Sequence, residues 1–225
     1  MSLIYINPYS FSGIVTDGLV LHLDAGNSTS YPGSGTTWTD LSGNGNTATL
    51  TSGPTYSSAN GGSIVFDGGN DYAPIGTSSF PFGASAGTIS LWAKTDTITG
   101  GFRSLVAYGT PAVPKARFMA IENTTYFFGG YGSDITATGV PLNTWFNMSG
   151  VYTGTNALLY VNGALVAGPT AKTWNTVSSL ATIGRQLEST AYWDGNLSQL
   201  CVYNKALSAT EVLQNYNALR GRYGL

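Results

Sequence analysis

Apolar residues that recur at every second position are the feature that most constrains how this chain can fold. In residues 19–24, L-V-L-H-L-D, leucines occupy alternate positions. In residues 88–94, T-I-S-L-W-A-K, the side chains of Ile89, Leu91 and Ala93 fall on one face. Successive side chains of a strand point to opposite faces, whereas a helix repeats every 3.6 residues. The pattern therefore predicts β-strands with one face in a core.

The turn signals between these segments favour antiparallel pairing. Residues 156–166, N-A-L-L-Y-V-N-G-A-L-V, place two short apolar arms around Asn162-Gly163, which is the strongest short hairpin signal. Short strands bounded by Gly, Pro, Asn and Ser recur along the chain, with no internal repeat and no linker. The 225 residues are enough for one large domain. We therefore expect a single β-sandwich or barrel.

Only the C-terminal stretch departs from this pattern. Ser208 and Glu211 have the spacing of a capping box, and Leu207 and Val212 are placed for a hydrophobic staple. An apolar stripe of helical period follows, and Gly221 can end it. The sequence predicts one short helix packed on the β domain.

The composition excludes several partners. Charged residues make up 9% of the chain, far below the quarter that is usual, and the formal net charge is −2. Neither value gives the basic surface that nucleic acids or anionic membranes require. The first residues lack the pattern of a signal peptide, and no apolar run has membrane-spanning length. We expect a soluble domain that binds neither nucleic acid nor membrane.

Residues 1–16 are apolar and aromatic but lie outside the strand pattern. We interpret them as an N-terminal arm that docks on a neighbouring subunit, with residues 17–225 forming the sandwich. The arm residues expected to make this contact are Leu3, Ile4, Tyr5, Ile6, Tyr9 and Phe11.

Four stretches, taken in order, resemble the laminin G-like branch of the concanavalin A-like sandwiches. They are residues 19–46, residues 63–72, residues 88–94 with 145–163, and residues 194–211. The resemblance implies two curved antiparallel sheets packed face to face. The expected fold is thus all-β, a two-sheet antiparallel jelly-roll sandwich with one short C-terminal helix.

One part of this pattern is more specific. Domains in structural proteins of tailed bacteriophages are similar to one stretch of this chain, V-T-D-G-L-V-L-H-L-D-A-G-N followed by S-Y-P-G-S-G-T-T-W-T-D-L-S. Such domains also occur in bacterial surface proteins. The resemblance implies a non-enzymatic virion structural protein, a capsid decoration or a fibre- or tail-associated protein. It would sit at the virion surface as an oligomer with other virion proteins and bind host glycans. The alternatives are a bacterial carbohydrate-binding module or surface adhesin, and a glycoside hydrolase.

Hydrolysis of glycosides needs two carboxylates that flank one bond. The three glutamates, Glu122, Glu188 and Glu211, have no acidic neighbour at the E-x-D-x-x-E spacing of strand-borne pairs. Asp67 and Asp71 are close, but F-D-G-G-N-D-Y is typical of a strand end and turn. We predict no catalytic residues and no enzyme activity.

Nucleophilic and general-base catalysis are also disfavoured. The only histidine, His22, lies within an apolar strand, which favours a packed structural role. The only cysteine, Cys201, has strand-like flanks and is predicted to be a buried thiol.

Calcium is the metal to test. Asp40, Ser42, Asn44 and Gly45 fit the first half of an EF-hand loop, but Thr51 stands where the bidentate glutamate is needed. One carboxylate among neutral oxygens would give a weak structural site at best.

The resemblance implies a second calcium position, which glycanase relatives form with an aspartate on the last strand. That strand often has the form I-D-E-V-R-I-Y, whereas this chain has L-S-Q-L-C-V-Y, with Ser198 and Gln199 at the two acidic positions. Asp24, Asp40 and Asp194 remain candidate ligands, although turn capping explains each of them. We predict no metal and no cofactor.

Sugar binding needs flat aromatic side chains beside polar groups, because a pyranose has an apolar face and a polar edge. Such residues gather in two turn-like segments, 127–134 and 190–196. The candidate ligand-binding residues are Tyr131, Asp134, Tyr192 and Trp193. For Trp193 we favour core packing, since the resemblance places Trp38, Trp92, Trp145 and Trp193 at core positions.

Overall fold

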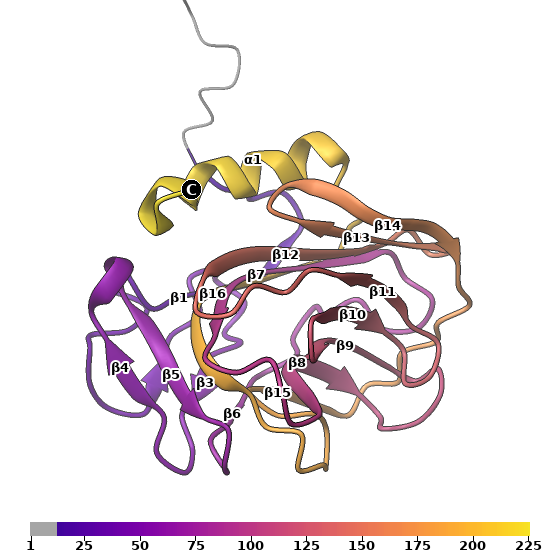
Figure 1. Ribbon diagram of the computed structural model, residues 1–225. Helices are drawn as coiled ribbons and strands as arrows, with labels where there is room; N and C mark the ends of the chain where they lie inside the picture. Colours follow the sequence, from indigo (N-terminus) through magenta and orange to yellow (C-terminus); the bar gives the residue numbers. More distant parts are fainter. Residues whose placement is uncertain (1–12) are drawn as a thin grey trace, which may run out of the picture.

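A computed structural model describes residues 13–225, which form two antiparallel sheets packed face to face with one helix over the larger sheet (Figure 1). This arrangement confirms the predicted sandwich and its single short helix. The arm residues Leu3, Ile4, Tyr5, Ile6, Tyr9 and Phe11 lie outside the described residues.

The larger sheet has the strand order β14–β13–β12–β7–β16–β5–β4, and β1 also pairs with β16. Every pairing in it is antiparallel. Its strands are β1 (Leu19–Asp24), β4 (Thr55–Ser57), β5 (Ser63–Asp67), β7 (Gly87–Thr95), β12 (Trp145–Tyr152), β13 (Asn156–Val161), β14 (Ala164–Ala171) and β16 (Asp194–Tyr203).

The smaller sheet has six strands in the order β11–β10–β9–β8–β15–β6. They are β6 (Ala73–Pro74), β8 (Phe102–Gly109), β9 (Ala116–Glu122), β10 (Thr125–Gly129), β11 (Ile135–Thr138) and β15 (Leu180–Ile183). A two-stranded ribbon, β2 (Thr37–Trp38) with β3 (Ala48–Thr49), and the 3-10 helices η1 (Ala59–Gly61) and η2 (Arg220–Tyr223) complete the elements apart from α1.

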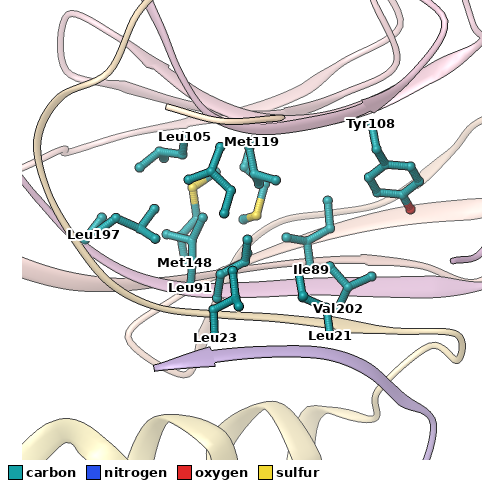
Figure 2. Close-up of a cluster of buried hydrophobic side chains, with 14 of the residues drawn as sticks. Leu21, Leu23, Ile89, Leu91, Leu105, Tyr108, Met119, Met148, Leu197 and Val202 are labelled. Atoms are coloured by element: carbon teal, nitrogen blue, oxygen red, sulfur yellow. The ribbon is translucent and has the colours of Figure 1, made fainter. Parts of the chain in front are cut away.

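The core fills the space between the sheets. Figure 2 shows Leu91 and Met148 from the larger sheet facing Leu105 and Met119 from the smaller one. All four side chains are fully buried. Removal of this much apolar surface from water is the main favourable term in folding.

The predicted alternation is wrong at the start of β1. Leu21 and Leu23 point into the core and Val20 also lies in the core cluster, but Leu19 packs in a separate cluster with Val15 and Tyr203. The pairing of β1 with β16 shifts register between Leu19 and Leu21. A bulge of this kind reverses which face a side chain occupies, so the leucine stripe is interrupted.

The predicted hairpin is confirmed between β13 and β14. Asn162 and Gly163 have φ values of 50° and 77°. The type I′ turn requires positive φ at both positions, and asparagine and glycine accept it at the least cost.

The helix α1 (Ala209–Leu219) begins with the predicted capping box. Ser208 Oγ accepts from the Glu211 backbone N–H at 3.3 Å, and the Glu211 carboxylate accepts from the Ser208 N–H at 2.8 Å. The Trp92 ring, on the outer face of the larger sheet, stacks on Tyr216 of α1 and on Tyr223 of η2. The C-terminal elements therefore seal that face. Within the described residues, no helix is long and apolar enough to cross a membrane.

The described part of the predicted arm packs on the sandwich. Val15 is buried, its N–H donates to Asn215 Oδ1 at 2.8 Å, and its carbonyl accepts from the Tyr203 hydroxyl at 3.0 Å. Residues around Val15 therefore contribute to the stability of the domain.

Ser208→Ala should lower the free energy of unfolding by about 1 kcal/mol, because it leaves an N-terminal backbone N–H of α1 without its partner. Urea denaturation measures the change. Thr210→Ala, which removes an exposed hydroxyl outside the capping box, is the matched control. Equal effects of the two substitutions would contradict the capping role.

Candidate functional site

The outer face of the smaller sheet carries an aromatic cluster that is separate from the core. Phe102 lies edge-on to Phe118 and Phe127, with ring centroids 5.6 and 5.4 Å apart. Leu187, from the loop between β15 and β16, is buried in the same cluster. Phe102 and Phe127 stay half-buried, so part of each ring is open to solvent.

Tyr131 joins this cluster from the turn between β10 and β11. Its ring lies edge-on to Phe118 at 5.8 Å, and its hydroxyl donates to the Leu187 carbonyl at 3.2 Å. Burial raises the pKa of the Tyr131 hydroxyl, and the Glu188 carboxylate raises it further. Tyr131 therefore ties this turn to the 185–192 loop while one edge of it faces solvent.

Asp134 closes the same turn from inside. Its Oδ1 accepts from the Gly130 N–H at 3.0 Å. Burial raises the pKa of this carboxyl, although backbone hydrogen bonds and the Lys172 ammonium oppose the shift. The carboxylate thus shapes the turn, and it is the Asp134 carbonyl that accepts from Lys172 Nζ at 2.8 Å.

A hollow of about 450 Å³ lies beside this turn. That volume is within the ~300–1,000 Å³ range of small-molecule sites. Trp174 Nε1 donates to the Ser133 carbonyl at 2.8 Å and fixes one wall. The lining residues are Ser133, Gly154, Thr155, Ala171, Lys172 and Thr173. The lining thus combines three hydroxyl-bearing residues with Lys172, whose ammonium donates to the Asp134 carbonyl.

The four predicted ligand-binding residues lie in different environments in the structure. Tyr131 and Asp134 share one turn, and Tyr192 is half-buried at the end of the 185–192 loop. Trp193 is fully buried in the core between the sheets, which confirms the packing role favoured for it over ligand contact. Its indole has no surface left on which a sugar could stack.

Sequence reasoning missed Lys172 and Phe102. Lys172 follows β14 and meets Asp134, which is 38 positions away, only through the fold. Phe102 begins β8 and meets Phe127 across the sheet. The alternation in T-Y-F-F-G, with Tyr126 and Phe128 in the core, is the one signal that points Phe127 outward.

One pair of carboxylates was also missed. Asp67 on β5 and Asp194 on β16 stand opposite each other in the larger sheet. Arg103 Nη1 lies 3.9 Å from the Asp194 carboxylate, and Asp67 Oδ1 accepts from the Gly69 N–H at 2.8 Å. Burial raises the pKa of Asp194, and Arg103 opposes that shift. An ion pair and a turn thus already engage these two side chains.

The predicted EF-hand-like loop is a closed turn. The Asp40 carboxylate accepts from the His22, Ser42 and Asn46 backbone N–H groups, each at 2.9 Å, and from the Ser42 hydroxyl at 2.8 Å. Both carboxylate oxygens are therefore satisfied by the protein. Within residues 13–225, no three His, Cys, Asp or Glu side chains come together as a potential metal site.

The two candidate nucleophilic or basic residues are structural. Cys201 is buried, and burial raises the pKa of its thiol. His22 Nε2 lies 3.2 Å from Gln199 Nε2 on the neighbouring strand. Burial lowers the pKa of His22, while Asp24 and Asp40 partly oppose the shift.

The two-sheet fold agrees with a comparison of the sequence against protein-family models. The model of the concanavalin A-like lectin/glucanases superfamily matches residues 67–213, which is more than half of the chain. The chain belongs to this superfamily. A search of the curated proteins found no match.

Several solved structures share the superfamily fold. Domain 4 of AbnA, a GH43 extracellular arabinanase from Geobacillus stearothermophilus in complex with arabinotriose, is 16% identical with a TM-score of 0.65, over 88% of this chain and 98% of that one. The binding domain of Paraclostridial Mosquitocidal Protein 1 is 18% identical with a TM-score of 0.70, over 90% and 52%. Trypanosoma rangeli sialidase with the inhibitor DANA is 15% identical with a TM-score of 0.68, over 90% and 33%.

At these identities the likeness shows the fold alone. This chain spans nearly all of the arabinanase domain, about half of the toxin binding domain and a third of the sialidase. The superfamily fold is thus present in enzymes and in binding domains.

The lowered pKa of His22 predicts a loss of stability in mild acid. Below pH 6.5 the unfolded chain takes up a proton that the folded chain resists, so the free energy of unfolding should fall between pH 7 and pH 5. Because one imidazole titrates, the slope of the free energy of unfolding against pH corresponds to the uptake of at most one proton. Urea denaturation of His22→Gln should show a smaller slope, and an unchanged slope would contradict the assignment.

Proposed function

We propose that this protein is a non-enzymatic carbohydrate-binding adhesion domain, and that the 130–134 turn with its adjoining hollow forms the glycan site. The observation that carries the proposal is that an aromatic surface and a polar hollow adjoin the same turn, residues 130–134. Tyr131 and Phe127 offer partly exposed rings, and the hollow is lined by the hydroxyl-bearing residues Ser133, Thr155 and Thr173 together with Lys172. Sugars bind where an aromatic face adjoins a few polar groups.

The comparisons support this proposal without identifying the ligand. The arabinanase domain, nearly all of which this chain covers, was solved with arabinotriose. The receptor binding domain of botulinum neurotoxin type G, at 14% identity and a TM-score of 0.68, shares the fold as well. These neighbours thus include one domain solved with an oligosaccharide and two that are named as binding domains.

The carboxylates favour binding over catalysis. Glycosidases need a proton donor and a second free carboxylate on either side of the bond. Asp134 holds the turn, and Arg103 pairs with Asp194. The ring cluster and the hollow therefore present no free acid pair.

A glycan array followed by calorimetry tests the site. Lys172→Ala should weaken binding of the best glycan by about tenfold or more, since hydrogen bonds to a charged group contribute about 1.5–3 kcal/mol. Phe127→Ala should weaken it by removing an exposed ring edge. Arg220→Ala, which removes an exposed cation on the helix side of the sandwich, should bind as the wild type does.

Two results would contradict the proposal. If no glycan binds the wild-type protein, the adhesion role is wrong. If a bound oligosaccharide is cleaved and Asp194→Asn stops the cleavage, the protein is an enzyme instead.

We further propose that the domain is displayed on the surface of a bacteriophage particle, as an oligomer with other virion proteins. Besides the sequence resemblance, β14 favours an assembly role. It forms one edge of the larger sheet, has no charged residue, and exposes Leu165 and Val166 by 48% and 44%. Exposed apolar side chains at a sheet edge favour packing against another chain. Pro169 and the two register shifts in the pairing of β14 with β13 disfavour direct strand addition, so side-chain contacts would carry the assembly.

Deletion of residues 1–12 tests the predicted arm while keeping the packed Val15. In phage particles purified on a density gradient, the wild-type chain should sediment with the particles and the deleted chain should not. The thermal midpoint should be the same for both, since the deletion spares the described sandwich. Unchanged incorporation of the deleted chain would contradict the anchoring role.

A further inference from the structure

The guanidinium of Arg222, in η2 at the end of the chain, is surrounded by oxygen atoms. Its Nε donates to the Asn60 carbonyl at 3.1 Å, and its Nη2 donates to the Gly61 and Gly62 carbonyls at 3.1 and 2.9 Å. Three successive carbonyls of one short turn thus point at a single cation.

Two side chains complete this shell. Arg222 Nη1 donates to Asp24 Oδ1 at 2.7 Å, and Nη2 donates to Ser198 Oγ at 2.8 Å. Asp24 ends β1 and Ser198 lies on β16, so the guanidinium joins segments that are far apart in sequence. The side chains of Arg222 and Asp24 are only 16% and 14% exposed, so solvent screens this ion pair weakly.

The shell is built closely enough to exclude any additional side chain. A Cβ at Gly26 would lie 2.0 Å from Arg222 Nη2 and 2.1 Å from the Gly61 carbonyl. A Cβ at Gly62 would lie 2.6 Å from the Ala25 carbonyl, and Gly62 has a φ of 111° that L side chains rarely adopt. Glycine at both positions lets the carbonyls converge.

One carboxylate with four neutral oxygens is a hard-oxygen donor set of the type that Ca²⁺ accepts. The sequence resemblance implies a calcium position that glycanase relatives form with an aspartate on the last strand, at the place where this chain has Ser198. The residues present do not fit that ion, because a guanidinium already engages the five oxygens and would repel a divalent cation.

We propose that Arg222 acts as a built-in cation, which fills an oxygen-lined calcium site and makes the sandwich independent of Ca²⁺. Removal of the guanidinium uncovers the site, and Ca²⁺ then binds to Asp24, Ser198 and the carbonyls of the 60–62 turn. The Arg222 side chain thereby connects the segments that a bound calcium ion would otherwise hold together.

Thermal unfolding of wild type and Arg222→Ala in EDTA, 10 mM CaCl2 and 10 mM MgCl2 tests this proposal. The wild-type midpoint should not differ between EDTA and CaCl2. In EDTA, Arg222→Ala should melt about 5–10 °C lower, because the largely covered Asp24 carboxylate loses its cationic partner. Ca²⁺ should restore at least half of that loss, and Mg²⁺ less, since Mg²⁺ requires a smaller octahedral shell.

Two further variants locate the effect. Arg222→Lys keeps the positive charge and should show no response to Ca²⁺. Asp24→Asn with Arg222→Ala removes the carboxylate and should abolish the recovery. If Arg222→Ala does not fold in EDTA, refolding with and without CaCl2 replaces the melt, and calorimetry with CaCl2 on Arg222→Gln reports binding directly.

Three outcomes would overturn the proposal. The first is a wild-type protein that Ca²⁺ stabilises. The second is an Arg222→Ala protein that neither binds Ca²⁺ nor is stabilised by it, together with an Arg222→Gln protein that shows no binding. The third is an equal Ca²⁺ response with and without the Asp24 carboxylate, which would place the ion elsewhere.

Discussion

The burial of β16 on both of its faces is the constraint on which the rest of the sandwich depends. Nine of its ten residues are buried, and it pairs with β1, β5 and β7. Leu197 and Leu200 point into the core between the sheets, while Cys201 and Tyr203 pack against the N-terminal and C-terminal segments on the outside. A strand that is buried on both faces is shielded from water, so its polar groups need partners within the protein. The helix and the chain ends are needed to cover the outer face of this strand.

This requirement gives the two outer faces of the sandwich different roles. The outer face of the larger sheet is closed by α1 and η2, which stack on Trp92. The outer face of the smaller sheet keeps partly exposed rings, and a hollow lies between the turn that follows β10 and the end of β14. Ligand sites on a rigid scaffold usually occupy such loops and rims, because loops tolerate change without loss of the core.

Local signals in the sequence predicted local structure well. The capping box of Ser208 and Glu211, the Asn162-Gly163 hairpin and the alternating strands depend on residues a few positions apart, so they can be inferred without tertiary information. The site was predicted less completely. Tyr131 and Asp134 belong to one turn, but Phe102 meets Phe127 and Lys172 reaches Asp134 only through the fold.

The sequence by itself determined the strand and turn pattern and the single helix, because these follow from short-range periodicity and turn chemistry. Its four motif stretches carried the resemblance to the superfamily. Only the tertiary structure decided which side chains lie together. It placed Leu187 over the aromatic cluster, and it brought Arg222 to Asp24 across 198 positions. The physical reason is that sheet register and packing set these contacts, and a single bulge, as at Leu19, changes the face that a residue occupies.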